Sequence, residues 1–177
     1  MILVLNGPLG VGKTATAWQL LALLHEAALV DIDHVVAVRP FDWRLAAHRS
    51  YAYSSAALLA GHHIRHGYQH VVVTWVFETP AELMALRKQF VGLGEVFVCR
   101  LTCSPDTLAG RVRARANGNV ESEVTRALEL QALLEAAAAT GDLGVPVSAE
   151  EGTAYQVAQG VLAHVPGYLP ERAERPV

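Results

Sequence analysis

Short apolar runs alternate with amphipathic segments along the chain. Residues 1–5 (MILVL) form an uninterrupted apolar run, as expected of a strand that is buried on both faces. Residues 13–28 then repeat alanine and leucine at helical spacing, which predicts a helix packed against a sheet. Residues 27–32 and 69–77 are further apolar runs and predict a second and a third strand.

The rest of the chain continues this order. Two more strands are predicted at 95–101 and 144–147, and helices at 43–65, 79–91, 104–115, 122–140 and 151–164. Strands that alternate with helices favour a parallel sheet covered on both faces. We therefore expect one α/β domain over residues 1–177, with a helical lid at about 111–125 and a loosely held tail at about 166–177.

A glycine-rich turn joins the first strand to the first helix. Residues 7–14 (GPLGVGKT) match GxxxxGK[ST]. In this motif backbone N–H groups and the helix dipole face the phosphates, the lysine reaches the β- and γ-phosphates, and the hydroxyl holds Mg²⁺. The residues predicted to surround the phosphates of ATP are Gly7, Pro8, Leu9, Gly10, Val11, Gly12, Lys13, Thr14 and Ala15.

The composition strengthens the case for Lys13. The chain contains twelve arginines but only two lysines, Lys13 and Lys88. A sequence that uses arginine for almost every cation still has lysine at this position of the motif. A compact ammonium suits a phosphate loop, and a planar guanidinium would not replace it.

Two carboxylates follow the second apolar run. Side chains two apart on a strand point to the same face, so Asp31 and Asp33 can both reach the crevice beside the phosphate loop. One of the two can hold a water on Mg²⁺, while the other takes the proton from a substrate hydroxyl. The alternative is that both are turn residues that cap the next segment.

A cluster of arginines ends the helix predicted at 104–115. Arg111 and Arg115 lie four residues apart and therefore on one helix face. We expect them to stack on the adenine and to clamp the transferring phosphoryl group, whereas Arg113 faces away as a surface charge. The alternative is an ordinary basic helix end that is stabilised by the helix dipole.

Several classes of protein carry this phosphate-loop motif. GTPases need an Asn-Lys-x-Asp segment to read the base, and the sequence contains none. Oligomeric ATPase motors carry an acidic residue at the end of an apolar strand, where the third run offers Thr74 and Trp75 instead. The acidic role therefore moves to Asp31 and Asp33, which favours a kinase.

These motifs resemble those of the small P-loop kinases, which include shikimate kinase and the nucleoside monophosphate kinases. Residues 32–40 and 71–77 are similar in character to chloramphenicol phosphotransferase, and residues 101–118 to the tunicamycin-resistance proteins. The resemblance implies a three-layer α/β/α fold with a five-stranded parallel sheet in the order 2-3-1-4-5. It also implies that ATP and Mg²⁺ are bound, and that Asp31 lies near Mg²⁺, with Thr14 as the metal ligand of the phosphate loop. Asp33 would then be the base, and Arg111 and Arg115 would lie over the nucleotide.

The resulting hypothesis is an ATP-dependent phosphotransferase that acts on a hydroxyl of a small molecule, such as an antibiotic or a nucleoside- or sugar-like compound. ATP is expected rather than GTP, although the sequence alone leaves this choice open. One alternative is a metabolic kinase of the shikimate or nucleoside monophosphate type. Another is a nucleotide-binding regulatory module with little catalysis.

Aromatic and charged residues after the acidic pair are candidates for the acceptor site. Phe41, Tyr51 and Phe77 belong to the same aromatic set, which could equally be core. An anionic acceptor would require Arg39 and Arg44 to face the crevice. The candidate acceptor-site residues are Asp33, Arg39, Asp42, Trp43, Arg44 and Trp75.

The other features point to an ordinary protein of the cytoplasm. A net charge of −3 gives no reason to expect nucleic acid or a membrane as a partner, and no apolar run is long enough to span a bilayer. Cys99 and Cys103 form no disulfide framework. The histidines at 62, 63, 66 and 70 lie close enough in sequence to suggest a zinc site, but exposed helix-end histidines are the simpler explanation. The sequence leaves open whether the chain forms a homodimer.

Overall fold

The computed structural model describes residues 1–115 and 119–168. Five strands form one parallel sheet in the order β2-β3-β1-β4-β5, which confirms the predicted fold class and strand order. The strands are β1 (Ile2–Asn6), β2 (Ala27–Asp31), β3 (His70–Thr74), β4 (Val96–Thr102) and β5 (Val145–Ser148).

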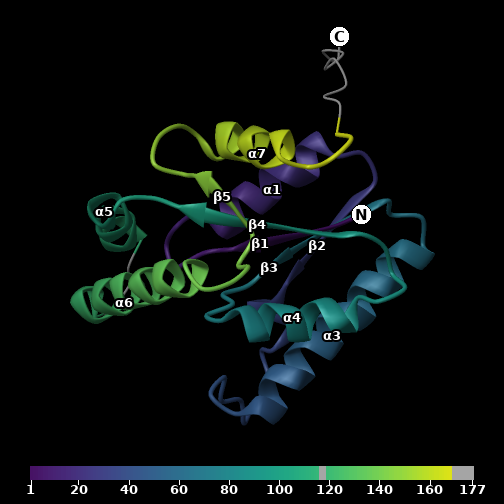
Figure 1. The fold of residues 1–177 in the computed structure, drawn as a ribbon, viewed down its shortest axis with the longest axis horizontal. Helices are drawn as coiled ribbons and strands as arrows, with labels where there is room; N and C mark the ends of the chain where they lie inside the picture. The colour runs from purple at the N-terminus through teal and green to yellow at the C-terminus, as the bar shows by residue number, and fades with distance from the viewer. Residues whose placement is uncertain (116–118, 169–177) are drawn as a thin grey trace.

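Helices cover both faces of this sheet (Figure 1). In that view α1 and α7 lie above the sheet and α3 and α4 lie below it, while α5 and α6 lie together beyond the end to which β4 points. Within the described residues, no helix combines the length and apolar character needed to cross a membrane. The helices are α1 (Lys13–Leu23), α2 (Ile32–Val35), α3 (Ala46–Arg65), α4 (Pro80–Gln89), α5 (Pro105–Arg115), α6 (Val120–Ala138) and α7 (Ala154–Ala163).

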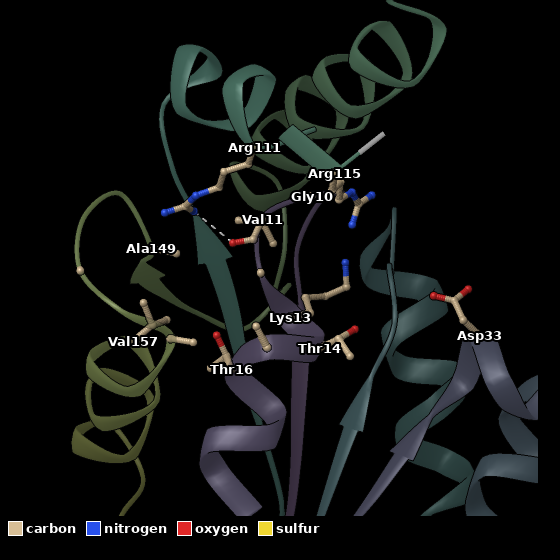
Figure 2. Close-up of a pocket in the computed structure, with 14 residues that line it drawn as sticks. Gly10, Val11, Lys13, Thr14, Thr16, Asp33, Arg111, Arg115, Ala149 and Val157 are labelled. Carbon is tan, nitrogen blue, oxygen red and sulfur yellow. Dashed lines mark hydrogen bonds between the residues drawn. The ribbon is translucent and has the colours of Figure 1, made fainter. Parts of the chain in front are cut away.

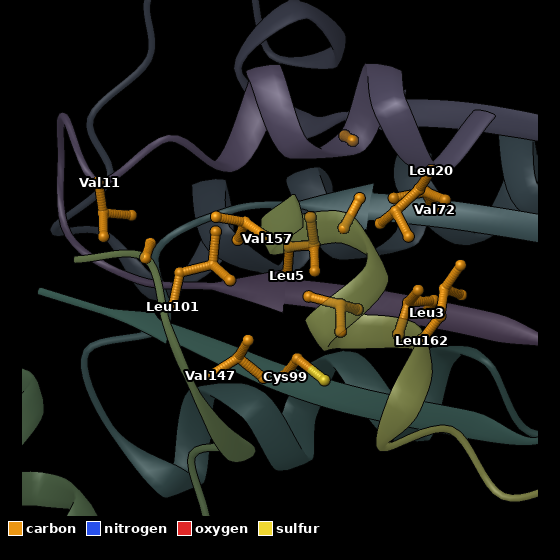
Figure 3. Packing of buried hydrophobic residues seen from close by; sticks show 14 of the residues in the cluster. Leu3, Leu5, Val11, Leu20, Val72, Cys99, Leu101, Val147, Val157 and Leu162 are labelled. Atoms are coloured by element: carbon orange, nitrogen blue, oxygen red, sulfur yellow. The ribbon is translucent and has the colours of Figure 1, made fainter. Parts of the chain in front are cut away.

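The sheet separates two apolar clusters. Side chains alternate along a strand, so Leu3 and Leu5 of β1 enter one cluster, while Ile2 and Val4 enter the other. Figure 3 shows the first cluster between the sheet and the helices α1 and α7. All four side chains are fully buried. This is why the first strand is apolar at every position rather than at alternate ones.

Asn6 closes β1 and ties three segments together. Its side-chain oxygen accepts hydrogen bonds from the N–H groups of Gly7 (2.8 Å) and Phe77 (3.0 Å). Its amide donates to the carbonyls of Phe77 (3.3 Å) and Leu143 (3.4 Å). The residue is fully buried, so these bonds replace water and fix the segments that follow β1 and β3 and precede β5.

Two elements end earlier than the sequence predicts. The first helix ends at Leu23 rather than near 28, because the chain turns at Glu26 with a φ of 49° and enters β2. The third strand ends at Thr74 rather than 77, since Asn6 takes over the hydrogen bonding of Phe77. The predicted lid at 111–125 and tail at 166–177 include residues 116–118 and 169–177, which lie outside the described residues.

Candidate active site

The phosphate loop runs from β1 to α1 at the carboxyl edge of the sheet. Gly7 and Gly10 have φ values of 143° and 87°, which L-residues with a side chain rarely adopt. A Cβ on Gly7 would lie 2.9 Å from the carbonyl oxygen of Leu101, and one on Gly10 would lie 2.5 Å from a methyl carbon of Val112. The loop therefore needs glycine at both positions for its conformation and for its packing against β4 and α5.

The start of α1 faces the same cleft. Gly12 is the N-cap residue and provides no side-chain hydrogen bond, so the first N–H groups of α1 are left for another acceptor. The ammonium of Lys13 donates to the carbonyl oxygens of Gly7 (2.8 Å) and Pro8 (3.0 Å). Desolvation of this ammonium lowers the pKa of Lys13 to about 8, although the carboxylates of Asp33 and Asp31 act in the opposite direction.

Thr14 and Asp31 place two oxygen donors side by side. The Thr14 hydroxyl donates to Oδ2 of Asp31 at 3.3 Å, while Oδ1 of Asp31 accepts the N–H of Asp33 at 3.1 Å and caps α2. Thr74 pairs with Asp31 in the sheet register, and its buried hydroxyl has no hydrogen-bond partner within the described part of the chain. An all-oxygen donor set of this kind suits Mg²⁺, which prefers hard oxygen ligands and retains several waters.

Asp33 lies on a different element from the one predicted. The sequence placed Asp31 and Asp33 on one strand, but β2 ends at Asp31 and Asp33 lies in the first turn of α2. The alternative prediction of a cap is therefore confirmed for Asp31. Desolvation at the cleft wall raises the pKa of Asp33, and the charge of Asp31 adds to this increase while Lys13 opposes it. Both carboxylates still border the phosphate loop, because the strand end positions the helix start.

The two arginines of α5 reach different parts of the cleft. Figure 2 shows the guanidinium of Arg115 above Lys13 and the carboxylate of Asp33 to its right. Arg111 extends instead along the outer side of the loop, where it donates to the carbonyl oxygens of Val11 (3.2 Å) and Glu150 (3.4 Å). Arg113 does not line the cleft, and its exposed side chain pairs with Glu121. This agrees with the prediction that Arg113 is a surface charge.

These elements enclose a cleft of about 530 Å³, within the range of small-molecule sites. The sequence analysis missed its far wall, which the segment after β5 and the start of α7 supply. No motif marks those residues, because they contribute shape and apolar surface rather than a fixed chemistry. The lining residues are Gly10, Val11, Gly12, Lys13, Thr14, Ala15, Thr16, Asp33, Arg111, Arg115, Ala149, Gly152, Ala154 and Val157.

A network around Glu150 holds this far wall against α5. Its carboxylate accepts hydrogen bonds from the N–H of Ser104, the hydroxyl of Ser104 (2.7 Å) and the hydroxyl of Thr107 (2.6 Å). The bond from Thr107 and those from Ser104 lower the pKa of Glu150. Because the backbone of Glu150 also accepts from Arg111, the network fixes the arginine relative to the cleft.

A second cavity of about 360 Å³ meets the first at Asp33. Aromatic rings from three separate segments form much of its wall. Two ion pairs form part of its wall: Arg126 pairs with Glu78 at 3.0 Å, and Arg49 pairs with Glu82 at 3.5 Å. The lining residues are Leu9, Asp33, Val36, Phe41, Trp43, Arg49, Tyr53, Trp75, Val76, Glu78, Glu82, Arg126 and Leu130.

Comparison with known proteins identifies the family. A model of a family described as an AAA domain matches residues 2–138, well over half of the chain. The chain belongs to the AAA domain family. No curated protein matches it by sequence.

Solved structures similar to this AAA domain include small kinases. A gluconokinase from Sinorhizobium meliloti 1021 has a TM-score of 0.67 at 16% identity, with 91% of this chain and 89% of that chain covered. A tunicamycin resistance protein of Deinococcus radiodurans has a TM-score of 0.60 at 20% identity, with 92% and 93% covered. A shikimate kinase from Acinetobacter baumannii has a TM-score of 0.60 at 19% identity, with 91% and 90% covered. At these identities the similarity shows a shared fold, in agreement with the group that the sequence resembles.

Part of the predicted acceptor side of the AAA domain needs correction. Trp43 and Trp75 line the second cavity, but Arg39, Asp42 and Arg44 line neither cavity. The carboxylate of Asp42 accepts the N–H of Arg44 at 2.9 Å and pairs with its guanidinium at 3.4 Å. This local pairing holds the turn before α3 and keeps the Arg44 side chain 76% exposed. Arg39 is also exposed.

The remaining aromatic candidates divide between surface, core and cavity. Phe77 is fully buried in the core and Tyr51 is exposed, whereas Phe41 lines the second cavity. Arg49 and Tyr53, which the sequence analysis missed, enter the cavity from α3. They lie four residues apart and so share a helix face. That spacing could have pointed to them.

The histidine cluster of the AAA domain shows no metal site. Among the described residues, no group of three or more His, Cys, Asp or Glu side chains could hold a metal ion. The rings of His62 and His66 lie 4.2 Å apart at the end of α3, and Nδ1 of His66 contacts the His62 carbonyl oxygen at 2.8 Å. Burial raises the pKa of the Cys99 thiol to about 12, so this cysteine remains a protonated core side chain.

Proposed function

We propose that this AAA domain is a kinase that transfers the γ-phosphate of ATP to a hydroxyl of a small molecule. The observation that carries the proposal is the position of Asp33, which lines both cavities. One cavity contains the phosphate loop and the other is walled by aromatic side chains. A carboxylate at their junction is placed to receive a proton from an acceptor in the second cavity.

Each residue of the phosphate side has a defined task in this proposal. The loop N–H groups and the start of α1 bind phosphate oxygens, and Lys13 reaches the β- and γ-phosphates. Arg115 lies beside Lys13 and can neutralise charge on the transferring group. Arg111 connects the phosphate loop to the far wall of the cleft through its hydrogen bonds and would lie beside the nucleotide.

Thr14 and Asp31 would hold Mg²⁺. When bound, the ion neutralises charge on the β- and γ-phosphates. Asp31 contributes the oxygen that faces Thr14, because its other oxygen caps α2. This division keeps Asp31 in place and leaves Asp33 as the carboxylate that faces the acceptor.

Desolvation also prepares Asp33 for its role. Its raised pKa makes the carboxylate a stronger base than a fully hydrated aspartate. The Asp33 carboxylate then takes the proton of the acceptor hydroxyl while the acceptor oxygen attacks phosphorus. Phosphoryl transfer needs little further help beyond positioning and charge neutralisation.

The Asp33→Asn variant tests the proposal. The amide keeps the size of the side chain but cannot take a proton, so transfer should fall by at least about 100-fold while ATP affinity changes little. ADP release across a panel of hydroxyl compounds measures transfer, and calorimetric titration measures ATP affinity. Asp106→Asn, an exposed site on α5 outside both cavities, is the matched control. Full turnover in Asp33→Asn would show that Asp33 is not the base.

The similar proteins do not indicate which compound is the acceptor. The three similar proteins, a gluconokinase, a shikimate kinase and a tunicamycin resistance protein, are named after chemically different compounds. The hypothesis from the sequence, an antibiotic or a nucleoside- or sugar-like compound, is compatible with all three of these names. The choice must therefore come from the second cavity itself.

A further inference from the structure

Both arginines among the described residues that line the second cavity are held in ion pairs. Arg126 pairs with Glu78, and Arg49 pairs with Glu82. Together with Asp33 the wall carries three carboxylates and two guanidinium groups, so carboxylates are in excess. Each guanidinium is already balanced by a neighbouring carboxylate. An anionic acceptor placed here would meet no unpaired arginine among the described lining residues and would lie near carboxylates.

The other arginines proposed for this side lie outside it. Arg39 and Arg44 are exposed and line neither cavity. Lys13 and Arg115 line only the phosphate cleft. Binding an anionic alcohol, such as a sugar acid or a nucleoside monophosphate, requires donors that meet its carboxylate or phosphate. The described cavity wall does not provide them.

The rest of the wall suits a flat, apolar group. Trp43, Trp75 and Phe41 line the cavity from two loops. The guanidinium of Arg126 lies 5.2 Å from the centre of the Trp43 ring, which holds that ring in place. Aromatic faces stack favourably on other flat apolar groups and also attract cations.

Tyr53 supplies a polar contact inside this wall. The residue is only 3% exposed, and its buried hydroxyl has no hydrogen-bond partner among the described residues. Burial raises the pKa of Tyr53, and the carboxylate of Glu82 adds to the increase. The phenol therefore stays neutral and can both donate and accept a hydrogen bond. A hydroxyl left unsatisfied behind the wall of a cavity is a suitable partner for a polar group on a ligand that reaches it.

We propose that the acceptor is an uncharged or positively charged alcohol that carries an aromatic or similarly flat apolar group, and that the paired arginines exclude carboxylated and phosphorylated alcohols. This inference deepens the proposed function and rests on the second cavity being its acceptor site. In the transfer, the hydroxyl proton passes to Asp33 and the oxygen forms a bond to the γ-phosphorus of ATP. The bond from that phosphorus to the β–γ bridging oxygen breaks, so ADP leaves and the acceptor becomes a phosphate monoester.

Three alcohols of one skeleton test the charge preference. They are 3-phenylpropane-1,2-diol (neutral), 2-amino-3-phenylpropan-1-ol (cationic) and 3-phenyllactate (anionic). Trp43 and Trp75 line the cavity, so their emission reports binding without ATP and without any transfer; Trp18→Phe removes the third tryptophan. We expect the neutral and cationic alcohols to bind at least about tenfold more tightly than 3-phenyllactate. Equal or tighter binding of 3-phenyllactate, or no response to any of the three at millimolar concentration, overturns the proposal.

The Glu78→Gln variant tests the reason for the preference. It removes the 3.0 Å pairing of Arg126 and leaves only the longer contact with Glu129 at 3.8 Å, so 3-phenyllactate binding should improve by about tenfold relative to the diol. Glu121→Gln breaks an exposed ion pair outside both cavities and should leave the order unchanged. An unchanged order in a folded Glu78→Gln protein means that the ion pair does not set the preference. The wild-type order decides the charge preference even where Glu78→Gln does not fold.

The Tyr53→Phe variant tests the polar contact, with the exposed Tyr51→Phe as its control. Loss of the hydroxyl should weaken diol binding by about fivefold, and Tyr51→Phe should not. Binding and transfer together separate the two proposals. Binding in the expected order without ADP release in any condition would sink the proposed kinase activity alone. Transfer that favours shikimate or gluconate over the diol would sink the acceptor class alone.

Discussion

The two cavities that meet at Asp33 hold charge in different ways. The phosphate cleft contains Lys13 and Arg115, with Thr14 and Asp31 at its edge. The second cavity, which we propose binds the acceptor, also contains arginines, but each of those described is paired with a glutamate. One side is therefore suited to a highly charged ligand, and the other to a flat ligand of little negative charge. Similar residue types thus serve opposite purposes, and their pairing rather than their number decides which ligand fits.

The Lys13→Met variant should produce the largest effect and act on one side alone. It removes the ammonium that reaches the phosphates, so kcat/KM for ATP should fall by about 100- to 1,000-fold. Binding of the neutral diol, read from tryptophan emission, should stay as in the wild type. Lys88→Met, on an exposed part of α4, is the control. A parallel loss of diol binding would mean that the two cavities do not act separately.

The Asn6→Ala variant should weaken both sides, because Asn6 ties together the segments behind them. Its removal leaves buried backbone groups of Phe77 and Leu143 unsatisfied, so the free energy of unfolding should fall by at least about 2 kcal/mol. Urea denaturation measures this loss. Asn119→Ala removes an exposed helix cap and should cost less. Equal stability of Asn6→Ala and the wild type would show that the four hydrogen bonds do not hold this edge of the sheet.

The Trp43→Ala variant should affect only the acceptor side. Loss of the ring removes apolar contact area and the partner of Arg126, so the KM for the acceptor should rise by about tenfold. The KM for ATP should remain unchanged, as initial-rate measurements would show. Trp18→Ala, on the exposed side of α1, is the matched control. A change in the KM for ATP alone would show that Trp43 does not contribute to acceptor binding.

The Glu150→Gln variant should have the smallest effect. It weakens the hydrogen bonds from Ser104 and Thr107 that hold the far wall of the phosphate cleft. The KM for ATP should rise by about threefold, because Arg111 is less well positioned. Glu151→Gln, at the exposed neighbouring residue, should match the wild type. Identical kinetics for the two variants would assign the Glu150 network to structure alone.

The phosphate side could be predicted because its residues are contiguous. A loop that binds phosphate with backbone N–H groups must place Gly7, Gly10 and Lys13 at fixed spacing, so the sequence records the geometry directly. The strand order was likewise accessible through the resemblance to small kinases. Asp33 was predicted beside the cleft but on the wrong element, since the pattern fitted both a longer strand and a cap at Asp31 and did not decide between them.

The acceptor side could not be predicted to the same extent. Arg126 and Glu78 are 48 residues apart, and only the folded chain brings their side chains together. In the sequence, Thr79 and Glu82 have the spacing of a capping box at the start of a helix. Thr79 does accept the N–H of Glu82 at 3.2 Å, but the Glu82 carboxylate turns to the N–H of Glu78 and to Arg49. A local motif therefore concealed a long-range role.

Phosphorus NMR of the protein with ATP and 3-phenylpropane-1,2-diol tests the central claim most directly. In the wild type, the γ-phosphate signal should be replaced by that of a phosphate monoester. Asp33→Asn should bind ATP and the diol but form no ester at a comparable rate. An ester formed at the wild-type rate by Asp33→Asn, or inorganic phosphate as the only product of the wild type, would contradict the claim that Asp33 joins the two cavities in transfer.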